Sequence, residues 1–128
     1  MKIKEKKLKV KSDIRGWLAE ILTPKDVGNK AFGLIVVTTA KPGQTKGRHY
    51  HKRKTEWYCV IKGDGMLTLI DNKTRETKKI EMGEKNMIMV QIPPNHFHLI
   101  ENIGKTEMFL LVYVNELFNP KEPDNYYE

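Results

Sequence analysis

Turn-forming residues punctuate this chain of 128 residues at short intervals, and this spacing constrains the fold more than any other feature. Glycine, proline and asparagine stand in small groups, among them Gly63-Asp64-Gly65, Met82-Gly83 and Pro93-Pro94-Asn95. The segments between such groups have strand length and are rich in β-branched and aromatic residues. The length suits one domain with its own core and is too short for two. The sequence therefore predicts a single all-β domain, a sandwich or barrel, over residues 1–128.

The expected strands are residues 32–39, 49–51, 56–62, 66–70, 78–81, 87–92, 96–101 and 108–114. The first of them is apolar and β-branched throughout, which is typical of a strand covered on both faces. Apolar residues alternate in 17–22 and favour a strand there rather than a helix. Residues 115–128 show no periodicity, so we expect an irregular tail across the surface, pinned by Tyr126 and Tyr127.

The formal net charge is +7, but lysine and arginine alternate with acidic residues along most of the chain. This mixture argues against nucleic acid as a partner and suits a small anion such as a nucleotide diphosphate. Only residues 1–11 form a dense basic run. They could be a disordered tail, or an edge strand exchanged between the subunits of a homodimer.

Neither a signal peptide nor a membrane-spanning apolar segment is evident, so we expect a cytoplasmic protein that does not enter a membrane. Cys59 is the single cysteine, which excludes an internal disulfide, and its apolar neighbours indicate a packing role.

One stretch carries the pattern Gly-x5-His-x-His-x4-Glu-x6-Gly, from Gly43 to Gly63. His49 and His51 are two residues apart in a segment of strand character, so both side chains leave the same face. Glu56 follows after a turn, and His98, in a second short strand, could add a fourth ligand from across a barrel. Three imidazoles and one carboxylate suit a divalent transition metal with positions left for water or substrate. We expect zinc, with manganese, iron, nickel and cobalt as alternatives.

A second pattern, Pro-x-Asn-x2-His-x3-Asn, runs from Pro93 to Asn102. With these two motifs the chain resembles the cupin superfamily, whose fold is a double-stranded β-helix, a jelly-roll-like barrel. The first motif matches at every fixed position. In the second, Asn95 replaces the usual turn glycine, and nine residues rather than five separate Gly83 from the proline. His98 falls on the ligand position of the family.

A closer likeness covers nearly the whole chain, from Arg15-Gly16 to Tyr126. It looks like the C-terminal cupin domain of bifunctional capsular-polysaccharide enzymes that act on UDP-linked 4-keto-6-deoxy amino sugars. In that family the metal-binding cupin epimerises carbon 3, and a fused reductase then acts on the ketone. Because no Gly-x-Gly-x-x-Gly fingerprint occurs here, the resemblance implies epimerase or isomerase chemistry, with a separate reductase acting on the product.

Epimerisation beside a ketone needs a base, an acid and an electrophile that polarises the carbonyl. A bound metal could be that electrophile or could only tie the barrel walls together. Each protein group that could carry the proton also has a plainer role, as a solvated lysine, a core tyrosine or a turn histidine. These groups are Lys54, which shares the parity of Glu56, and Tyr58, His96 and Tyr113.

Arg15, Lys46 and Arg48 flank the expected mouth and could bind the diphosphate of a UDP- or dTDP-linked sugar, although ordinary surface charge explains them equally well. Trp17 and Trp57 could stack on a base, but core packing is the commoner role of such residues. Two other functions remain open for the chain, a metal-dependent dioxygenase and a non-catalytic sugar-binding module.

Overall fold

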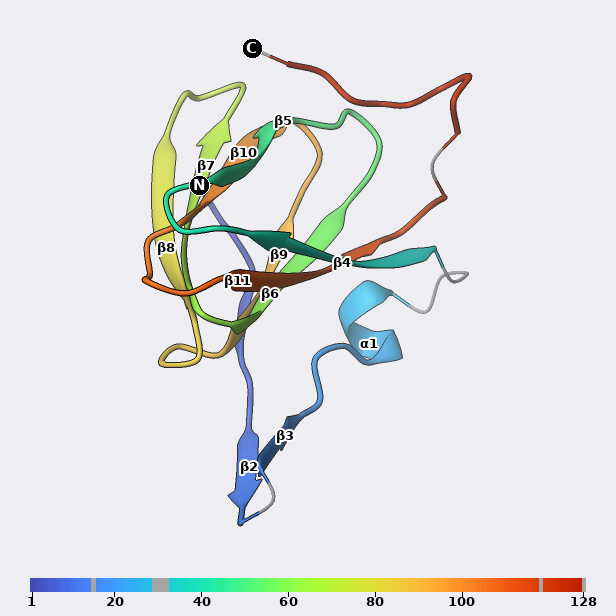
Figure 1. Ribbon diagram of the computed structural model, residues 1–128. Helices are drawn as coiled ribbons and strands as arrows, with labels where there is room; N and C mark the ends of the chain where they lie inside the picture. The colour runs from blue at the N-terminus through green and yellow to red at the C-terminus, as the bar shows by residue number, and fades with distance from the viewer. Residues whose placement is uncertain (15, 29–32, 118, 128) are drawn as a thin grey trace.

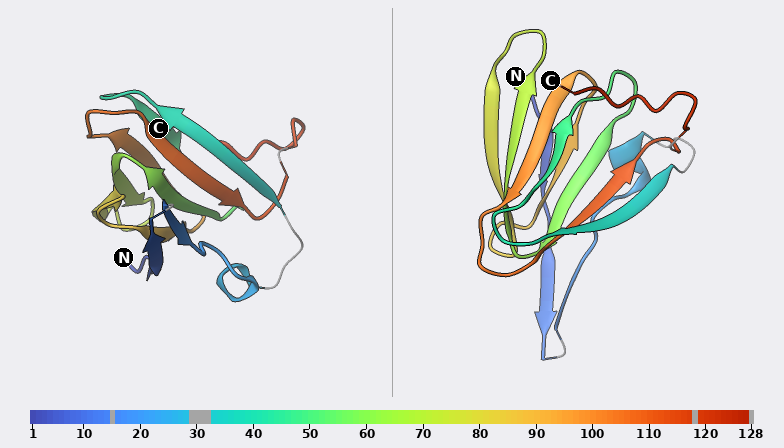
Figure 2. Two further views of the ribbon diagram at one scale, coloured as in Figure 1. Left: turned by 60° about the horizontal axis from the view of Figure 1, so that its bottom comes forward. Right: turned by 45° about the horizontal axis from the view of Figure 1, so that its top comes forward.

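Two antiparallel sheets face each other in the computed structural model, which describes residues 1–14, 16–28, 33–117 and 119–127 (Figure 1). The larger sheet has the strand order β1-β9-β6-β11-β4, and the smaller has the order β5-β10-β7-β8. A separate hairpin of β2 and β3 projects away from the barrel, as Figure 1 and the right-hand view of Figure 2 show. The all-β class predicted from the turn spacing and the jelly-roll-like barrel implied by the family resemblance are confirmed.

The elements are β1 (Glu5–Lys7), β2 (Val10–Asp13), β3 (Gly16–Ala19), α1 (Pro24–Val27), β4 (Leu34–Ala40), β5 (Thr45–His49), β6 (Glu56–Lys62), β7 (Asp64–Asp71), β8 (Thr77–Gly83), β9 (Ile88–Ile92), β10 (His96–Asn102) and β11 (Met108–Val114). Most expected strands agree with these to within a few residues. The segment expected at 49–51 is the exception, because β5 begins earlier and ends at His49. The strand favoured for residues 17–22 is present but ends at Ala19.

The main core lies between the two sheets. It takes alternate residues from each strand, including Tyr58 and Val60 of β6, Leu67 and Leu69 of β7, and Ile100 of β10. These side chains are between 0 % and 4 % exposed. Alternation along a strand sends the intervening residues to the opposite face of the sheet. The inward-facing residues of β6 and β10 therefore line the barrel interior, and Glu56 and His98 of the two motifs sit on these two strands.

A second apolar cluster covers the outer face of the larger sheet. Trp57 and Cys59 of β6 and Tyr113 of β11 pack there with Leu8 and Met87, and residues of the segment 19–27 close over them. The short helix α1 in this segment is not among the elements expected from the sequence. Thr23 and Asp26 form a capping box at its start, and Gly28 ends it with φ 77°.

Strand β4 corrects one expectation. Its apolar sequence predicts a strand buried on both faces, but Ile35, Val36 and Val37 are 52 %, 38 % and 55 % exposed. The reason is topological: among the described strands β4 pairs with β11 alone and forms an edge of the larger sheet. Amino-acid composition shows that a strand is apolar but does not show whether it lies at the edge or in the centre of a sheet.

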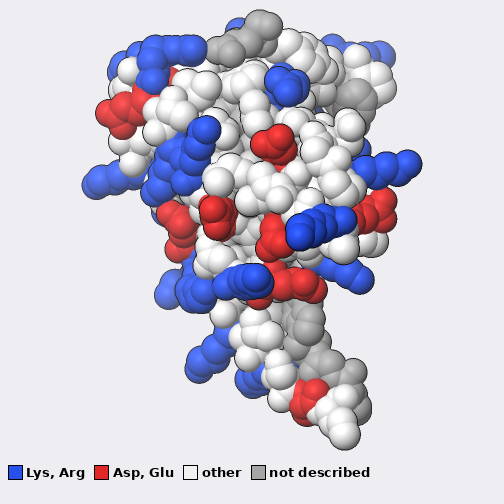
Figure 3. All heavy atoms as spheres, turned by 60° about the vertical axis from the view of Figure 1, so that its left-hand side comes forward, with Lys and Arg blue, Asp and Glu red and all other residues white. Residues whose placement is uncertain are grey.

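The basic N-terminal run forms strands rather than a disordered tail. β1 pairs with β9 at the other edge of the larger sheet, and β2 pairs with β3 in the projecting hairpin. Charges of both signs are interspersed over the face of the molecule shown in Figure 3. Within the described parts of the chain, no helix has the length and apolar character that crossing a membrane requires.

Candidate functional site

The structure brings the four expected metal ligands together at one end of the barrel. His49 ends β5, His51 lies in the loop that follows, Glu56 begins β6, and His98 belongs to β10. One ligand atom from each of the four lies within 4.8 Å of all the others. His51, Glu56 and His98 are buried, whereas His49 is half-buried. The partly exposed imidazole marks the side from which a small molecule could approach.

A β-bulge in β5 sets the direction of His49. Across the β5–β10 pair, His98 lies opposite His49 and Leu99 lies opposite Gly47, so Arg48 is an extra residue with no opposite partner. Gly47 has φ 95° and Arg48 has φ 66°. A β-carbon on Gly47 would stand 2.9 Å from the carbonyl oxygen of His98, so glycine is required at this close approach. Bulges of this kind redirect the side chains that follow them.

Backbone carbonyls fix the orientation of two of the histidine rings. Nδ1 of His51 donates to the carbonyl of Asp124 over 2.8 Å, and Nδ1 of His98 donates to the carbonyl of His96 over 3.0 Å. A carbonyl oxygen can only accept, so in both rings the proton is on Nδ1. Nε2 of each ring faces Oε1 of Glu56, at 2.8 Å for His51 and 3.0 Å for His98, so a proton or a cation must lie between each nitrogen and that oxygen.

The arrangement fits a cation. Nε2 of His49 and Nε2 of His98 are buried and have no hydrogen-bond partner among the described residues. The close approach of His98 to Glu56 brings the atoms together without the alignment of a hydrogen bond. Buried polar atoms without partners are costly unless an ion or water satisfies them. Three imidazole nitrogens converging on one carboxylate oxygen are the donor set that a transition metal needs.

The shifted pKa values of the cluster set the protonation states of its histidines and its carboxylate. Burial, followed by the charges of His98 and His51, lowers the pKa of His49 to about 4. Burial would raise the pKa of Glu56, but its contacts with His51 and His98 outweigh this and hold the pKa far below its usual range. Burial would lower the pKa of His51, but the hydrogen bond to Glu56 outweighs it and raises that pKa. At neutral pH His49 is therefore an unprotonated ligand beside an ionised carboxylate.

Two of the proposed proton-carrying residues, Tyr58 and Lys54, interact with these ligands, and a third, His96, begins the strand that carries His98. The Tyr58 ring packs edge-on against the His98 ring, with centroids 5.7 Å apart, and burial raises the pKa of its phenol. Nζ of Lys54 donates to the carbonyl of Pro123 over 3.0 Å. His96 starts β10 opposite Asp71 of β7, and Nε2 of His96 lies 3.7 Å from Oδ2 of Asp71.

Other expected residues lie elsewhere. Tyr113 is on the outer face of the larger sheet, where its hydroxyl accepts from the backbone N–H of Gly33, so it does not join the cluster within this chain. Trp57 is buried on that face and packs against Tyr113. Lys46 and Arg48 are exposed on β5, close in sequence to His49. Arg15 and the side chain of Trp17 lie outside the described residues.

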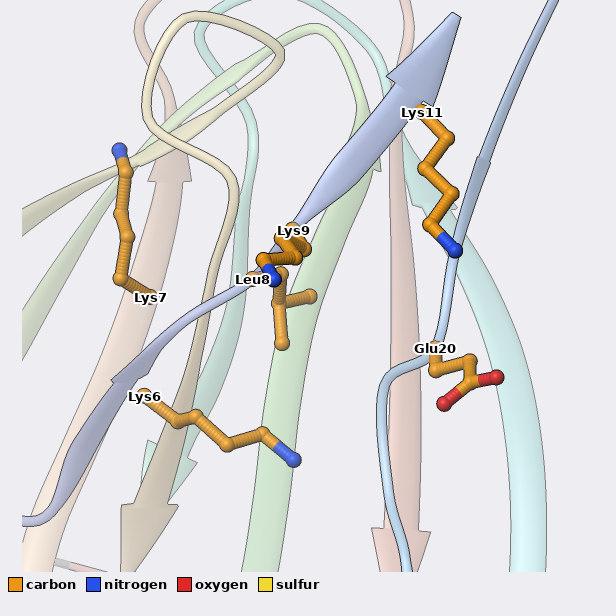
Figure 4. A pocket seen from close by; sticks show the side chains of 6 residues that line it. All are labelled: Lys6, Lys7, Leu8, Lys9, Lys11 and Glu20. Atoms are coloured by element: carbon orange, nitrogen blue, oxygen red, sulfur yellow. The ribbon is translucent and has the colours of Figure 1, made fainter.

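A hollow of about 260 Å³ beside the projecting hairpin is lined by four lysines but shares no residue with the cluster. In Figure 4 the side chains of Lys6 and Lys7 diverge rather than converge on one point. Nζ of Lys6 bonds to Asp26 and Nζ of Lys7 to Asn86. These two of the four ammonium groups therefore already have partners.

Comparisons with known proteins agree with the fold and the motifs. Residues 11–126 match the family model described as the polysaccharide biosynthesis C-terminal domain. The chain is 30 % identical to the spore coat polysaccharide biosynthesis protein SpsL of Bacillus subtilis, over 95 % of this chain and 84 % of that protein. It is 35 % identical to the UDP-2-acetamido-2,6-beta-L-arabino-hexul-4-ose reductase of Pseudomonas aeruginosa, over 90 % of this chain but only 30 % of the reductase.

Solved structures give the same result. The capsular polysaccharide assembling protein CapF of Staphylococcus aureus matches with a TM-score of 0.73 and 32 % identity, over 94 % of this chain and 34 % of that protein. A dTDP sugar isomerase of Desulfovibrio desulfuricans matches with a TM-score of 0.89 over 98 % of this chain and 83 % of that one, at 16 % identity, a likeness of fold. The chain thus spans about a third of the reductase and of CapF. It belongs to the polysaccharide biosynthesis C-terminal domain family.

Proposed function

We propose that this protein is a nucleotide-sugar epimerase or isomerase of surface polysaccharide synthesis. Its substrate is a UDP- or dTDP-linked 4-keto-6-deoxy sugar, and the reaction takes place beside the keto group, at carbon 3. The observation that carries this proposal is the convergence of three imidazoles and a carboxylate in a family of polysaccharide biosynthesis proteins. The names of the reductase from Pseudomonas aeruginosa and the isomerase from Desulfovibrio desulfuricans, which concern UDP- and dTDP-linked sugars, support the substrate class.

The reaction removes a proton from carbon 3 and returns one to the opposite face. A metal held by His49, His51, Glu56 and His98 would supply Lewis acidity toward the keto oxygen. Zinc is the metal we assign to this donor set, and borderline donors of this kind also suit manganese, iron, nickel and cobalt.

The protein must supply the base and the acid. His96 is the base that we favour, because Oδ2 of Asp71 lies 3.7 Å from its Nε2 and can orient the imidazole. Tyr58 is the favoured acid, because its raised pKa keeps the phenol protonated beside His98. Lys54, buried and held by the carbonyl of Pro123, would contribute positive charge near the developing oxyanion.

We further propose cytoplasmic action as a homodimer, with the cations Arg15, Lys46 and Arg48 contacting the diphosphate. The exposed apolar edge formed by Ile35, Val36 and Val37 supports association with a second copy. A separate reductase would act on the product, as the name of the Pseudomonas aeruginosa relative suggests.

The test is solvent exchange at carbon 3. The protein is incubated in heavy water with a UDP-linked 4-keto-6-deoxy amino sugar or its dTDP counterpart, and NMR follows the loss of the carbon 3 proton signal. Deuterium incorporation supports the epimerase. Binding of the sugar without exchange would favour a sugar-binding module, and oxygen consumption by the iron-loaded protein would favour a dioxygenase.

A further inference from the structure

The C-terminal segment 123–127, here called the strap, crosses the end of the barrel that holds the ligand cluster (Figure 1). Tyr126 forms an antiparallel bridge with Tyr50, which stands between His49 and His51. Two backbone hydrogen bonds of 2.9 Å and 3.0 Å close this bridge, and the two tyrosine rings stack with centroids 5.4 Å apart. Nζ of Lys52 lies 4.2 Å from the centre of the Tyr126 ring. The strap is therefore fastened to the loop that carries two of the ligands.

The side chain of Asp124 in the strap accepts hydrogen bonds from the backbone of this loop. Its Oδ1 accepts from the backbone N–H of Lys52 over 2.9 Å, and its Oδ2 accepts from the N–H groups of Arg53 and Lys54 over 2.9 Å and 3.0 Å. The residue is 5 % exposed and has φ 55°, a backbone conformation that aspartate and asparagine tolerate better than most residues. One buried carboxylate thus satisfies three successive backbone donors between His51 and Glu56.

The main chain of the same residue orients a ligand. The carbonyl of Asp124 accepts from Nδ1 of His51, whose Nε2 lies 2.8 Å from Oε1 of Glu56. Asp124 and His51 are 73 residues apart in sequence, so this contact depends on the docked strap. Partners of this kind fix the tautomer and the ring direction of a ligating histidine.

We propose that Asp124 is a positioning residue, which holds the strap on the ligand loop and thereby sets the orientation of His51 and the metal affinity of the cluster. The strap also places the Tyr127 ring 6.3 Å from the ring of His49, beside the half-buried ligand. This inference rests on the metal binding assumed in the proposed function. Loss of such a supporting contact typically weakens metal binding by about 10- to 100-fold.

The experiment compares Asp124→Ala and Asp124→Asn with the unaltered protein in the full chain. Asn125 and Tyr126 stay in place, and Lys121→Ala, an exposed change in the same tail, is the matched control. Zinc affinity is measured by competition with a chromophoric chelator, and the cobalt-loaded protein gives a ligand-field spectrum. In the metal-free protein at mildly alkaline pH, ¹⁵N NMR of the histidine rings reports which nitrogen of His51 carries the proton.

We expect Asp124→Ala to raise the zinc dissociation constant by about 10- to 100-fold, alter the cobalt spectrum and redistribute the His51 proton between its two nitrogens. Asp124→Asn keeps one acceptor oxygen, so its zinc dissociation constant should lie between those of Asp124→Ala and the unaltered protein. The dissociation constant of Lys121→Ala should be within about twofold of that of the unaltered protein. If Asp124→Ala does not fold, as judged by circular dichroism, Asp124→Asn decides alone.

Unchanged zinc affinity together with an unchanged His51 tautomer in the folded Asp124 variants would overturn the inference. Failure of the unaltered protein to bind zinc or cobalt would instead contradict the metal site of the proposed function. In that case the His51 ring signals still decide whether Asp124 orients this histidine.

Discussion

Nε2 of His51 lies 2.8 Å from Oε1 of Glu56, while Nδ1 of the same ring donates to a backbone carbonyl. A neutral ring with its proton on Nδ1 would turn a lone pair toward the carboxylate. Either a proton or a cation must then lie between the two groups. The proposed metal would take the place of that proton between the two groups.

Removing one ligand should abolish metal stabilisation. An ion at 100 times its dissociation constant stabilises the folded protein by about 2.7 kcal/mol. We expect zinc to raise the melting temperature of the unaltered protein by roughly 5–15 °C, and to have little effect on Glu56→Gln. The His96→Gln variant, which retains all four ligands, is the control. Differential scanning calorimetry with and without zinc measures the shift, and equal shifts in Glu56→Gln and the unaltered protein would refute the assignment.

His49 should make the metal-free protein less stable in mild acid. Its pKa is about 4 in the folded protein against 6.5 as the ordinary value, so below pH 6.5 the unfolded chain takes up the proton first. Stability from this residue is complete above pH 6.5 and is lost as pH falls toward about 4. The raised pKa of His51 changes stability only above this ordinary value, where its contribution is lost as the pH rises.

Urea denaturation of the metal-free protein between pH 6.5 and pH 4.5 measures this dependence. Glu56 affects the pH dependence of stability only at lower pH, because its ordinary pKa is 4.5. In His49→Gln the decline over this range should be shallower. An identical decline in both proteins would show that another group is responsible.

The bulge should tolerate no side chain at Gly47. Gly47→Ala combines a strained φ with a contact of 2.9 Å to the His98 carbonyl, so we expect a loss of about 3 kcal/mol in the free energy of unfolding. Gly43→Ala is the matched control, because Gly43 also has positive φ but has nothing within 4 Å of the added carbon, and should lose only about 1 kcal/mol. Chemical denaturation compares the two, and similar losses would contradict the steric account.

Tyr58 and Tyr113 should differ in catalysis. Tyr58→Phe removes the hydroxyl of a ring that packs on His98, and general acids contribute about 100-fold or more to a rate. Tyr113→Phe removes a hydroxyl on the opposite face of the sheet. We expect kcat to fall about 100-fold in the first variant and to change little in the second. Epimerase assays that gave the opposite ranking would assign the acid to the other face.

The edge strand β4 should form the interface of the proposed homodimer. Val37→Lys places a charge on a side chain that is 55 % exposed on an unpaired strand edge, and should halve the molar mass in solution to 14.9 kDa. Lys73→Glu, in the exposed turn after β7, alters charge elsewhere and should leave the mass unchanged. Light scattering after size exclusion measures both, and a dimeric Val37→Lys would move the interface to another surface.

Much of this fold follows from local sequence signals, and so does the ligand set. His49, His51 and Glu56 lie within eight residues, so one strand end and one turn bring them together. The sequence could not show which of Tyr58 and Tyr113 faces the barrel interior. Strands β6 and β11 are apolar on both faces, so they lack the alternation of apolar and polar residues that identifies the inward face. Asp124 was missed as a supporting residue because its contacts with the ligand loop span about 70 residues and leave no periodic pattern.

The most direct test of the account is deuterium exchange at carbon 3 of a UDP-linked 4-keto-6-deoxy amino sugar, measured by NMR with metal-stripped and zinc-restored protein and with His98→Ala. We expect exchange with the zinc-restored protein and at least about 100-fold slower exchange in the other two samples. Equal exchange in all three samples would contradict it, because the four converging ligands would then have no part in the chemistry.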